Sequence, residues 1–259
     1  MIASLSDNRP AQAPLADAPV PPRFSLVMPL FNEGAHIYDN LRRTSETVRM
    51  LGPLGDCEII VANDGSLDNS RAEVDRAEAD IPGVRALHLT HGGKGEALRQ
   101  GARMATGEFV IFFDSDLDIP PEQILFFIAV QRAKKADAVI GSKMHPDSTV
   151  HYPFIRRVYS VGYFALTKIL FGLPIRDTQT GLKLVRRNLL LRALEQTQVK
   201  GFAFDLELLV RLVQLKAVMV EAPVVVEYKF KFGGIGIHTV WGILNDTLST
   251  WRRTRGGTT

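Results

Sequence analysis

The sequence is organised around residues 108–121, which read Glu108-Phe109-Val110-Ile111-Phe112-Phe113-Asp114-Ser115-Asp116-Leu117-Asp118-Ile119-Pro120-Pro121. The first half of this stretch is short, almost entirely apolar and rich in aromatic and β-branched side chains, which predicts a buried strand. The strand ends abruptly at three alternating carboxylates, and two prolines then open an apolar helix. Carboxylates crowded at a buried strand end repel one another and resist desolvation, so a neutralising cation is expected there.

The hard oxygen ligands of Asp114, Asp116 and Asp118 indicate Mg²⁺ or Mn²⁺. An acidic turn whose aspartates cap the following helix is the simpler alternative. A calcium loop is not favoured, because its required glycine and glutamate are replaced here by Ile119 and Leu125. A phosphatase-type aspartate nucleophile is not favoured either, because the Thr or Gly that usually follows it is missing. We therefore predict a metal site that binds a diphosphate.

Strands and helices alternate outward from this stretch, which indicates right-handed βαβ units and a doubly wound, mostly parallel α/β sheet. Strands are predicted at 24–28, 57–62, 84–89, 108–113, 138–143 and 224–230. We expect Pro29 to end the first strand, and Asn32 and Ser66 to cap the helices that follow the first two strands. Further helices are predicted at 94–105, 121–134, 154–173, 204–215 and 237–251.

Polar clusters follow four of these strands, at residues 29–33, 63–68, 92–95 and 114–118. Ligands of doubly wound sheets bind at the carboxyl ends of the strands, so these clusters predict one ligand-binding edge. Neither a dinucleotide-binding glycine pattern nor a P-loop is present, which argues against a dehydrogenase or a P-loop NTPase. Lys94 lies between glycines and is predicted to approach a phosphate, unless its loop is only a flexible entry to a helix.

Positive charge is concentrated in the C-terminal part of the chain. Lysine and arginine number 19 against 22 acidic residues in residues 1–182, and 12 against 6 in residues 183–259. This distribution suits an anionic substrate or an anionic membrane surface. The apolar helix at 154–173 carries Arg156, Arg157 and Lys168, so it is either a core or partner-contact helix or an interfacial one. Nucleic acid is not an expected partner, because no basic stripe is interleaved with stacking aromatics.

The composition is that of a soluble globular protein, with 46% apolar and 23% charged residues among 259. Residues 1–22 are expected to form a disordered tail, 23–236 one domain, and 237–259 an amphipathic helix with a basic tail. The single cysteine, Cys57, excludes an internal disulfide and fits a reducing compartment. No secretion signal or membrane-spanning helix is apparent, so we expect a cytoplasmic protein, at the inner face of the membrane if it contacts lipid.

Several motifs occur together in an order that resembles one known family. They are Met28-Pro29-Leu30-Phe31-Asn32-Glu33, Asn63-Asp64-Gly65-Ser66-Leu67-Asp68, Gly93-Lys94-Gly95-Glu96-Ala97, Asp114-Ser115-Asp116-Leu117, Gly141-Ser142-Lys143 and Asp177-Thr178-Gln179-Thr180-Gly181-Leu182-Lys183. The chain resembles family-2 nucleotide-sugar glycosyltransferases of GT-A fold, most closely the dolichol-phosphate or polyprenyl-phosphate mannose synthase group, over residues 24–245.

The resemblance implies roles for individual residues. The base and ribose would be held by Pro29, Phe31, Glu33, Ala62 and Asp64, with Asp64 accepting a base N–H. The sugar diphosphate and its metal would be held by Asp114 and Asp116, beside Ser115, with Asp118 at a position usually occupied by Gln. Catalytic roles fall to Asp116, to Asp177 beside the acceptor, and to Lys143, which replaces an Arg of the family.

The chain also departs from the family pattern. Asn63 replaces the first Asp of the usual Asp-Asp-Gly-Ser. The usual late phosphate clamp is missing, and Lys229 and Lys231 stand in its place and are expected to assist the leaving diphosphate. Many members of the family also have C-terminal membrane helices, which are not seen in this sequence.

These observations predict a metal-dependent, inverting glycosyltransferase that uses an NDP-sugar of the GDP-mannose or UDP-sugar type. The expected acceptor is a polyprenyl or dolichyl phosphate at a membrane surface. The alternatives are transfer to a soluble hydroxyl acceptor, a non-catalytic nucleotide-sugar binder, and a metal-dependent phosphohydrolase.

Overall fold

The computed structural model describes residues 23–52, 56–150, 154–199, 201, 203–227 and 237–255. Its main sheet has the strand order β3-β2-β1-β4-β7-β5-β8. These strands are β1 (Phe24–Leu30), β2 (Cys57–Asn63), β3 (Val84–His88), β4 (Phe109–Phe112), β5 (Ala138–Ser142), β7 (Lys183–Arg186) and β8 (Met219–Pro223). A short parallel pair, β6 (Thr149–Val150) and β9 (Val225–Val226), lies apart from it.

The sheet is mostly parallel, as predicted. β1 pairs in parallel with both β2 and β4, and β5 pairs in parallel with β8. β7 is antiparallel to its two neighbours, β4 and β5. The carboxyl ends of β1, β2, β3 and β4 therefore meet at one edge, where the polar clusters were predicted.

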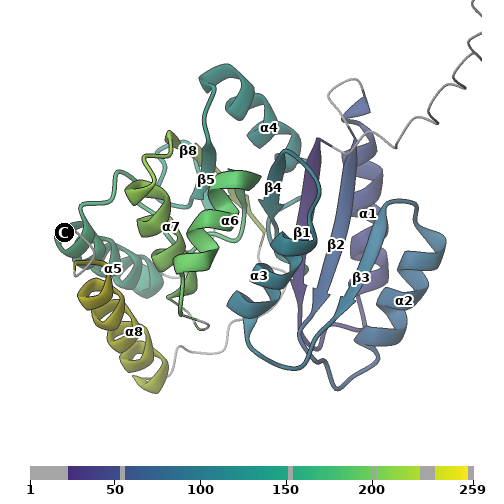
Figure 1. Cartoon of the computed structure of the whole chain (residues 1–259), viewed down its shortest axis with the longest axis horizontal. Helices are drawn as coiled ribbons and strands as arrows, with labels where there is room; N and C mark the ends of the chain where they lie inside the picture. Colours follow the sequence, from purple (N-terminus) through teal and green to yellow (C-terminus); the bar gives the residue numbers. More distant parts are fainter. Residues whose placement is uncertain are drawn as a thin grey trace, which may run out of the picture.

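Helices cover both faces of the sheet (Figure 1). They are α1 (Ile37–Arg49), α2 (Ser70–Asp80), α3 (Lys94–Met104), α4 (Gln123–Lys134), α5 (Phe154–Phe171), α6 (Arg187–Gln196), α7 (Phe204–Gln214) and α8 (Ile237–Arg255). Alternate residues of each strand enter two separate cores, because side chains of a strand alternate between its faces. On β1, Leu26 belongs to the core that includes side chains of α1, α2 and α4, whereas Val27 belongs to the core that includes side chains of α3, α6 and α7.

Three local predictions are wrong. Pro29 lies within β1, opposite Ala62, because the pairing of β1 with β4 has already ended at Val27 and a missing N–H costs no ladder bond there. Asn32 and Ser66 do not cap helices, since α1 and α2 begin after His36 and Asn69. The amide oxygen of Asn32 accepts the Leu67 N–H, and the Ser66 hydroxyl accepts the Asn32 N–H, so the two residues join the first two loops.

The C-terminal region also differs from expectation. The strands β7 and β8 and the helix α6 were not predicted. The strand expected at 224–230 is seen only as β9, and its residues 228–230 lie outside the described part, as does the predicted tail at 1–22. Arg252 to Arg255, expected as a basic tail, belong to α8.

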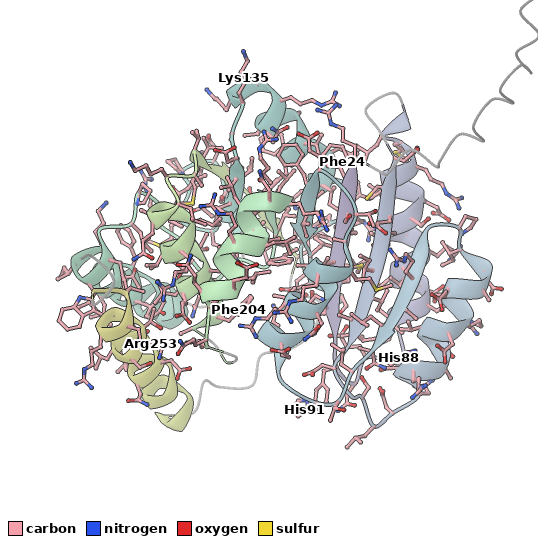
Figure 2. The ribbon with its side chains drawn as sticks, viewed as in Figure 1. Phe24, His88, His91, Lys135, Phe204 and Arg253 are labelled. Atoms are coloured by element: carbon pink, nitrogen blue, oxygen red, sulfur yellow. The ribbon has the colours of Figure 1, made fainter. Side chains whose placement is uncertain are left out.

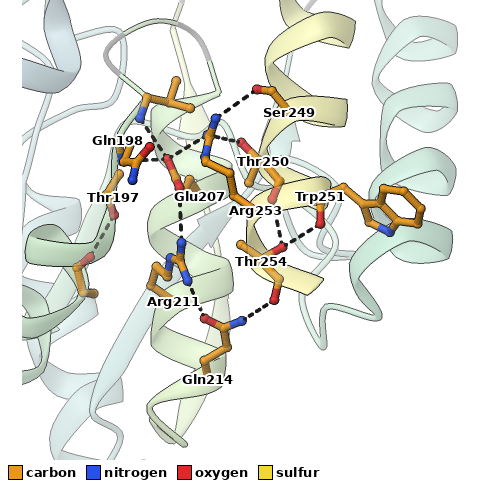
Figure 3. A network of polar contacts seen from close by, with 12 residues as sticks. Thr197, Gln198, Glu207, Arg211, Gln214, Ser249, Thr250, Trp251, Arg253 and Thr254 are labelled. Atoms are coloured by element: carbon orange, nitrogen blue, oxygen red, sulfur yellow. Dashed lines mark hydrogen bonds and ion pairs between the residues drawn. The ribbon is translucent and has the colours of Figure 1, made fainter. Parts of the chain in front are cut away.

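A buried carboxylate holds α8 against α7 (Figure 3). Glu207 on α7 is fully buried, and its Oε2 accepts the N–H groups of Gln198 and Val199 at 2.9 Å each. The guanidinium of Arg253 on α8 approaches Oε2 at 3.5 Å, and that of Arg211 approaches Oε1 at 3.6 Å. Because a buried charge requires such partners, this group fixes the orientation of α8. Among the described helices, none is long and apolar enough to cross a membrane.

Candidate functional site

A cavity of about 290 Å³ opens at the carboxyl edge of β1, β2 and β4. Eight of the residues predicted from the sequence line it: Pro29, Phe31, Glu33, Asp64, Lys94, Asp114, Ser115 and Asp116. Leu30, His91 and Gly93 complete its walls. Four separate loops thus meet at one site, as the positions of the polar clusters predicted.

An ion pair closes one side of the cavity. The Lys94 ammonium, at the N-terminus of α3, donates to Asp114 Oδ1 at 2.5 Å. Burial opposes ionisation of Asp114, but Lys94, Lys183 and Lys143 outweigh it and hold its pKa below the usual value. Burial would likewise lower the pKa of Lys94, but Asp114 and Asp205 raise it. Both groups therefore stay charged at neutral pH.

Two other carboxyl groups of the cavity, those of Glu33 and Asp116, are less well compensated. Burial raises the pKa of Glu33 to about 7, and the negative charges of Asp116 and Asp114 add to that rise. Burial and then the charge of Asp114 raise the pKa of Asp116 to about 6. A bound cation would relieve this repulsion.

The third predicted metal ligand does not join the site. Among the described residues, no three His, Cys, Asp or Glu side chains are placed to hold one ion. Asp118 is not part of the cavity wall, and its backbone N–H donates to Asp116 Oδ1 at 3.0 Å. Leu117, which lies between Asp116 and Asp118, is a buried residue with a φ of +53°. Within the described part of the chain, the three predicted carboxylates are therefore not grouped in this cavity.

The remaining donor set still fits a divalent cation. Asp114 and Asp116 supply carboxylate oxygens to the same cavity, and a neighbouring lysine is available for a diphosphate. Mg²⁺ is typically bound by one or two carboxylates together with substrate phosphates and water, so two protein ligands are enough. The chemistry of the residues thus matches Mg²⁺ or Mn²⁺ held with a diphosphate.

A second group of contacts shapes the wall formed by the loops after β2 and β3. Asp64 Oδ1 accepts the Gly92 N–H at 2.7 Å, and its Oδ2 accepts the Gly93 N–H at 2.9 Å. The ring of His91 stacks on Phe31 with centroids 4.6 Å apart. Figure 2 places His91 beyond the end of β3. His91 was missed by the sequence reasoning, although it directly precedes the glycine-rich loop that was singled out.

Asn63, the departure from the usual Asp, has its own partners. Its amide oxygen accepts the N–H and the hydroxyl of Ser66 at 3.1 and 2.6 Å. Its amide nitrogen lies 3.1 Å from Nδ1 of His88, whose Nε2 lies 2.7 Å from Asp75 Oδ1. An amide suits this position because it donates to the ring while accepting from Ser66.

The other predicted residues lie outside the cavity or in its walls. Ala62 is fully buried within β2, and the Ser115 hydroxyl donates to the Pro29 carbonyl oxygen at 2.8 Å. Lys143 and Asp177 line a neighbouring cavity of about 30 Å³ beside α5. Lys229 and Lys231 lie outside the described residues.

Asp177 is occupied by its own loop. Its Oδ2 accepts the Lys143 N–H at 2.9 Å and the Thr180 hydroxyl at 2.6 Å, and its Oδ1 accepts the Gln179 N–H. Burial would raise its pKa, but the Lys143 charge and these donors lower it below the usual value. A carboxylate of this kind is a poor proton acceptor, so Asp177 orders the turn between α5 and β7.

Two further residues connect this turn to the cavity. The buried Lys183 donates to the Thr180 carbonyl oxygen at 2.5 Å and to Asp205 Oδ1 at 2.8 Å. A Cβ atom at Gly181 would lie only 2.0 Å from Asp114 Oδ2, so only glycine allows the turn to pack against this carboxylate. Both residues belong to a motif quoted above, but their roles became visible only in the fold.

The raised pKa values predict how stability depends on pH. A carboxyl group with a higher pKa in the folded than in the unfolded chain binds its proton more strongly when folded. Glu33 therefore stabilises the fold as pH falls from about 7 toward 5, and this contribution disappears as pH rises through 7. Without metal, the melting temperature of the wild type is expected to fall between pH 5.5 and 8 more than that of Glu33→Gln. The increase in melting temperature caused by Mn²⁺ should instead become larger as pH rises, because the cation binds the ionised carboxylates. Identical pH profiles for the two proteins would contradict this account of the cavity.

Comparison with known proteins identifies the family of the chain. The family described as Glycosyl transferase family 2 matches residues 25–192. Glycosyltransferase AglD of Haloferax volcanii is 29% identical over 247 residues, which cover 95% of this chain and 39% of AglD. Dolichyl-phosphate beta-glucosyltransferase ALG5C of Trichomonas vaginalis is 29% identical over 250 residues, covering 87% of this chain and 73% of that protein. The chain thus spans about two fifths of the length of AglD and most of ALG5C.

A solved structure shares the fold. It is glucosyl-3-phosphoglycerate synthase from Mycobacterium tuberculosis in complex with Mn²⁺, UDP-glucose and glycerol 3-phosphate. Its TM-score is 0.63 at 17% sequence identity, and the match covers 91% of this chain and 80% of the other. The GT-A fold expected from the sequence is therefore confirmed.

Proposed function

The chain belongs to glycosyl transferase family 2, and we propose that it transfers the sugar of a nucleoside diphosphate sugar to a polyprenyl phosphate. The observation that carries the proposal is the meeting of Asp114, Asp116 and Lys94 in one cavity at the carboxyl edge of the sheet. The names of relatives that act on dolichyl phosphate support the choice of acceptor. The Mn²⁺ and UDP-glucose in the structure of the fold neighbour support the choice of metal and donor.

Different residues of the cavity are proposed to bind different parts of the donor. Phe31 and His91 offer an aromatic wall to the base, and Lys94 offers positive charge to the diphosphate. Mg²⁺ or Mn²⁺, held by Asp114 and Asp116, would stabilise the negative charge that develops on the leaving diphosphate. Lys143 lies 3.5 Å from Asp177 and lowers the pKa of Asp114, so it adds positive charge on the acceptor side.

The transfer would be a direct displacement. An oxygen of the acceptor phosphate bonds to the anomeric carbon while the bond from that carbon to the diphosphate oxygen breaks. The products are a lipid-linked sugar phosphate and a nucleoside diphosphate, with inversion at the anomeric carbon. A phosphate monoester is already an anion at pH 7, so the enzyme need not supply a strong general base.

Asp177→Asn tests this difference between acceptors. We expect transfer to a polyprenyl phosphate to fall by less than about tenfold, because the carboxylate orders a turn and is not needed to remove a proton. The measurement is the rate of lipid-linked sugar formation, with nucleotide affinity determined in parallel. A loss of about 10³-fold with nucleotide binding intact would indicate a general base and favour a hydroxyl acceptor.

A lipid acceptor also requires a surface that meets the membrane. The helix α5 is apolar and exposes Ile169, of which 82% is accessible, and α8 packs beside it and exposes Leu248. The exposed Arg252, one helical turn after Leu248 on α8, would lie against anionic headgroups while these apolar side chains enter the interface. We propose that the α5–α8 face, defined by Ile169 and Leu248, contacts the membrane.

Ile169→Asp should release the protein from anionic liposomes, because it replaces an inserted apolar group with a repelled charge. The apparent partition constant measured by co-sedimentation is expected to fall by about tenfold. Met50→Asp is the matched control, since Met50 is 72% accessible at the end of α1 and should leave binding unchanged. If the wild type never co-sediments, the membrane face is refuted.

A further inference from the structure

The aspartate that the family resemblance assigns to the base lines the cavity, but its carboxylate is engaged mainly by its neighbouring loop. The side chain of Asp64 is only 4% accessible. Its two oxygens accept the N–H groups of Gly92 and Gly93, and Oδ2 also lies 3.0 Å from Nδ1 of His91. Asp64 therefore shapes the loop after β3, and His91 on that loop offers far more of its side chain to a ligand than Asp64 does.

His91 is held in place from three sides. Its ring stacks on Phe31 at 4.6 Å with an interplanar angle of 29°. Its Nδ1 lies 3.1 Å from the Asp64 carbonyl oxygen in addition to the carboxylate contact. Gly65, with a φ of +68°, packs so closely that a Cβ there would be 2.7 Å from the His91 backbone nitrogen. The side chain is nevertheless 60% accessible and lines the cavity, so it is oriented before any ligand arrives.

These contacts define the tautomer of the ring. Both neighbours of Nδ1, the carbonyl oxygen and a carboxylate oxygen of Asp64, are hydrogen-bond acceptors. The proton of a neutral imidazole must therefore lie on Nδ1, and Nε2 is left with a lone pair. A hydrogen-bond acceptor of fixed direction is thus present on a ring that lines the cavity and stacks on Phe31, which is itself 43% accessible.

We propose that Nε2 of His91 selects the donor base by accepting its ring N–H, an inference that rests on the proposed function. A base that lies in the plane of the His91 ring would cover the exposed part of Phe31. Uracil, thymine and guanine present a ring N–H at that edge, whereas cytosine and adenine present a ring nitrogen with a lone pair. Two lone pairs facing each other cannot form a hydrogen bond, so a site built in this way rejects cytidine and adenosine nucleotides.

The test compares UDP, GDP, CDP and ADP by titration calorimetry with Mn²⁺ at about pH 8, where imidazole is ordinarily neutral. The wild type should bind UDP or GDP about tenfold more tightly than CDP or ADP. His91→Phe keeps an aromatic ring on Phe31 but lacks Nε2, so it should lose this preference, because UDP and GDP lose a hydrogen bond while CDP and ADP no longer face a lone pair. Phe31→Leu is the matched control, because losing the stacking surface should weaken all four nucleotides alike.

A measurement on the wild type tests the same proposal independently of whether the variant folds. In ¹⁵N spectra of histidine-labelled protein, the Nε2 signal of His91 should be that of an unprotonated nitrogen. It should shift when the preferred nucleotide is added but not with CDP. A retained preference in His91→Phe, or an equal loss for all four nucleotides, would overturn the role of His91. A wild type that binds none of them would overturn the proposed function itself.

Discussion

Asp116→Asn is expected to reduce sugar transfer by at least about 10³-fold and to remove the effect of Mn²⁺ on nucleotide binding. The substitution preserves the size of the side chain but deletes the charge of one of the two carboxylates that are proposed to hold the metal. The raised pKa of Asp116, about 6, shows that burial and Asp114 already disfavour its charge in the free protein. A cation that relieves this repulsion gains affinity from both carboxylates, so the loss of one should be severe. Product formation and the Mn²⁺ dependence of nucleotide affinity measure the two effects.

Asp118→Asn is the matched control for this experiment. Asp118 has the same side chain two residues later, but it does not line the cavity. Transfer and metal dependence should stay within about threefold of the wild type. Equal losses in both variants would restore the three-carboxylate set that the sequence suggested, and full activity of Asp116→Asn would refute the metal site.

Gly181→Ala is expected to reduce the rate of sugar transfer by about 10²-fold. The melting temperature measured without nucleotide should change little. The added methyl group would lie 2.0 Å from Asp114 Oδ2 and 2.5 Å from its Cγ. Either the carboxylate or the turn must move, and both movements separate Asp114 from Lys94 or from the acceptor side. Displacement of a catalytic group by about 1 Å is enough for a loss of this size. The rate of transfer and the melting temperature give the two readouts.

Gly162→Ala provides the comparison, because a Cβ on this glycine of α5 meets nothing within 4 Å. It should leave transfer unchanged. If Gly181→Ala is as active as Gly162→Ala, the turn between α5 and β7 does not support the carboxylate of the cavity.

The part of the fold that could be predicted from the sequence is the part whose signals are local. β4 is a run of apolar residues, and its end is marked by aspartates within a few positions. The same holds for β1, β2 and β3, so the topology alone brought their polar ends to one edge. Eight of the predicted residues line one cavity for this reason.

The parts that were missed depend on contacts between distant segments. β7 has only four residues and begins with Lys183, whose burial becomes possible through Asp205 on α7. From the sequence alone, a lysine at this position is expected to be exposed, because its buried partner is not apparent. The position of Asp118 depends on a left-handed turn at Leu117, a conformation that sequence alternation does not reveal. His91 gains its direction from Asp64 and Phe31, which precede it by more than 20 residues.

The most direct test of the proposed function is the formation of a lipid-linked sugar by the purified protein. The assay supplies UDP-glucose or GDP-mannose labelled in the sugar, a polyprenyl phosphate in detergent, and Mn²⁺, and it measures label in the organic phase together with free nucleoside diphosphate. We predict equal amounts of labelled lipid and nucleoside diphosphate, both abolished by EDTA. Release of nucleoside diphosphate without labelled lipid, or label that appears only in a water-soluble product, would contradict transfer to a polyprenyl phosphate.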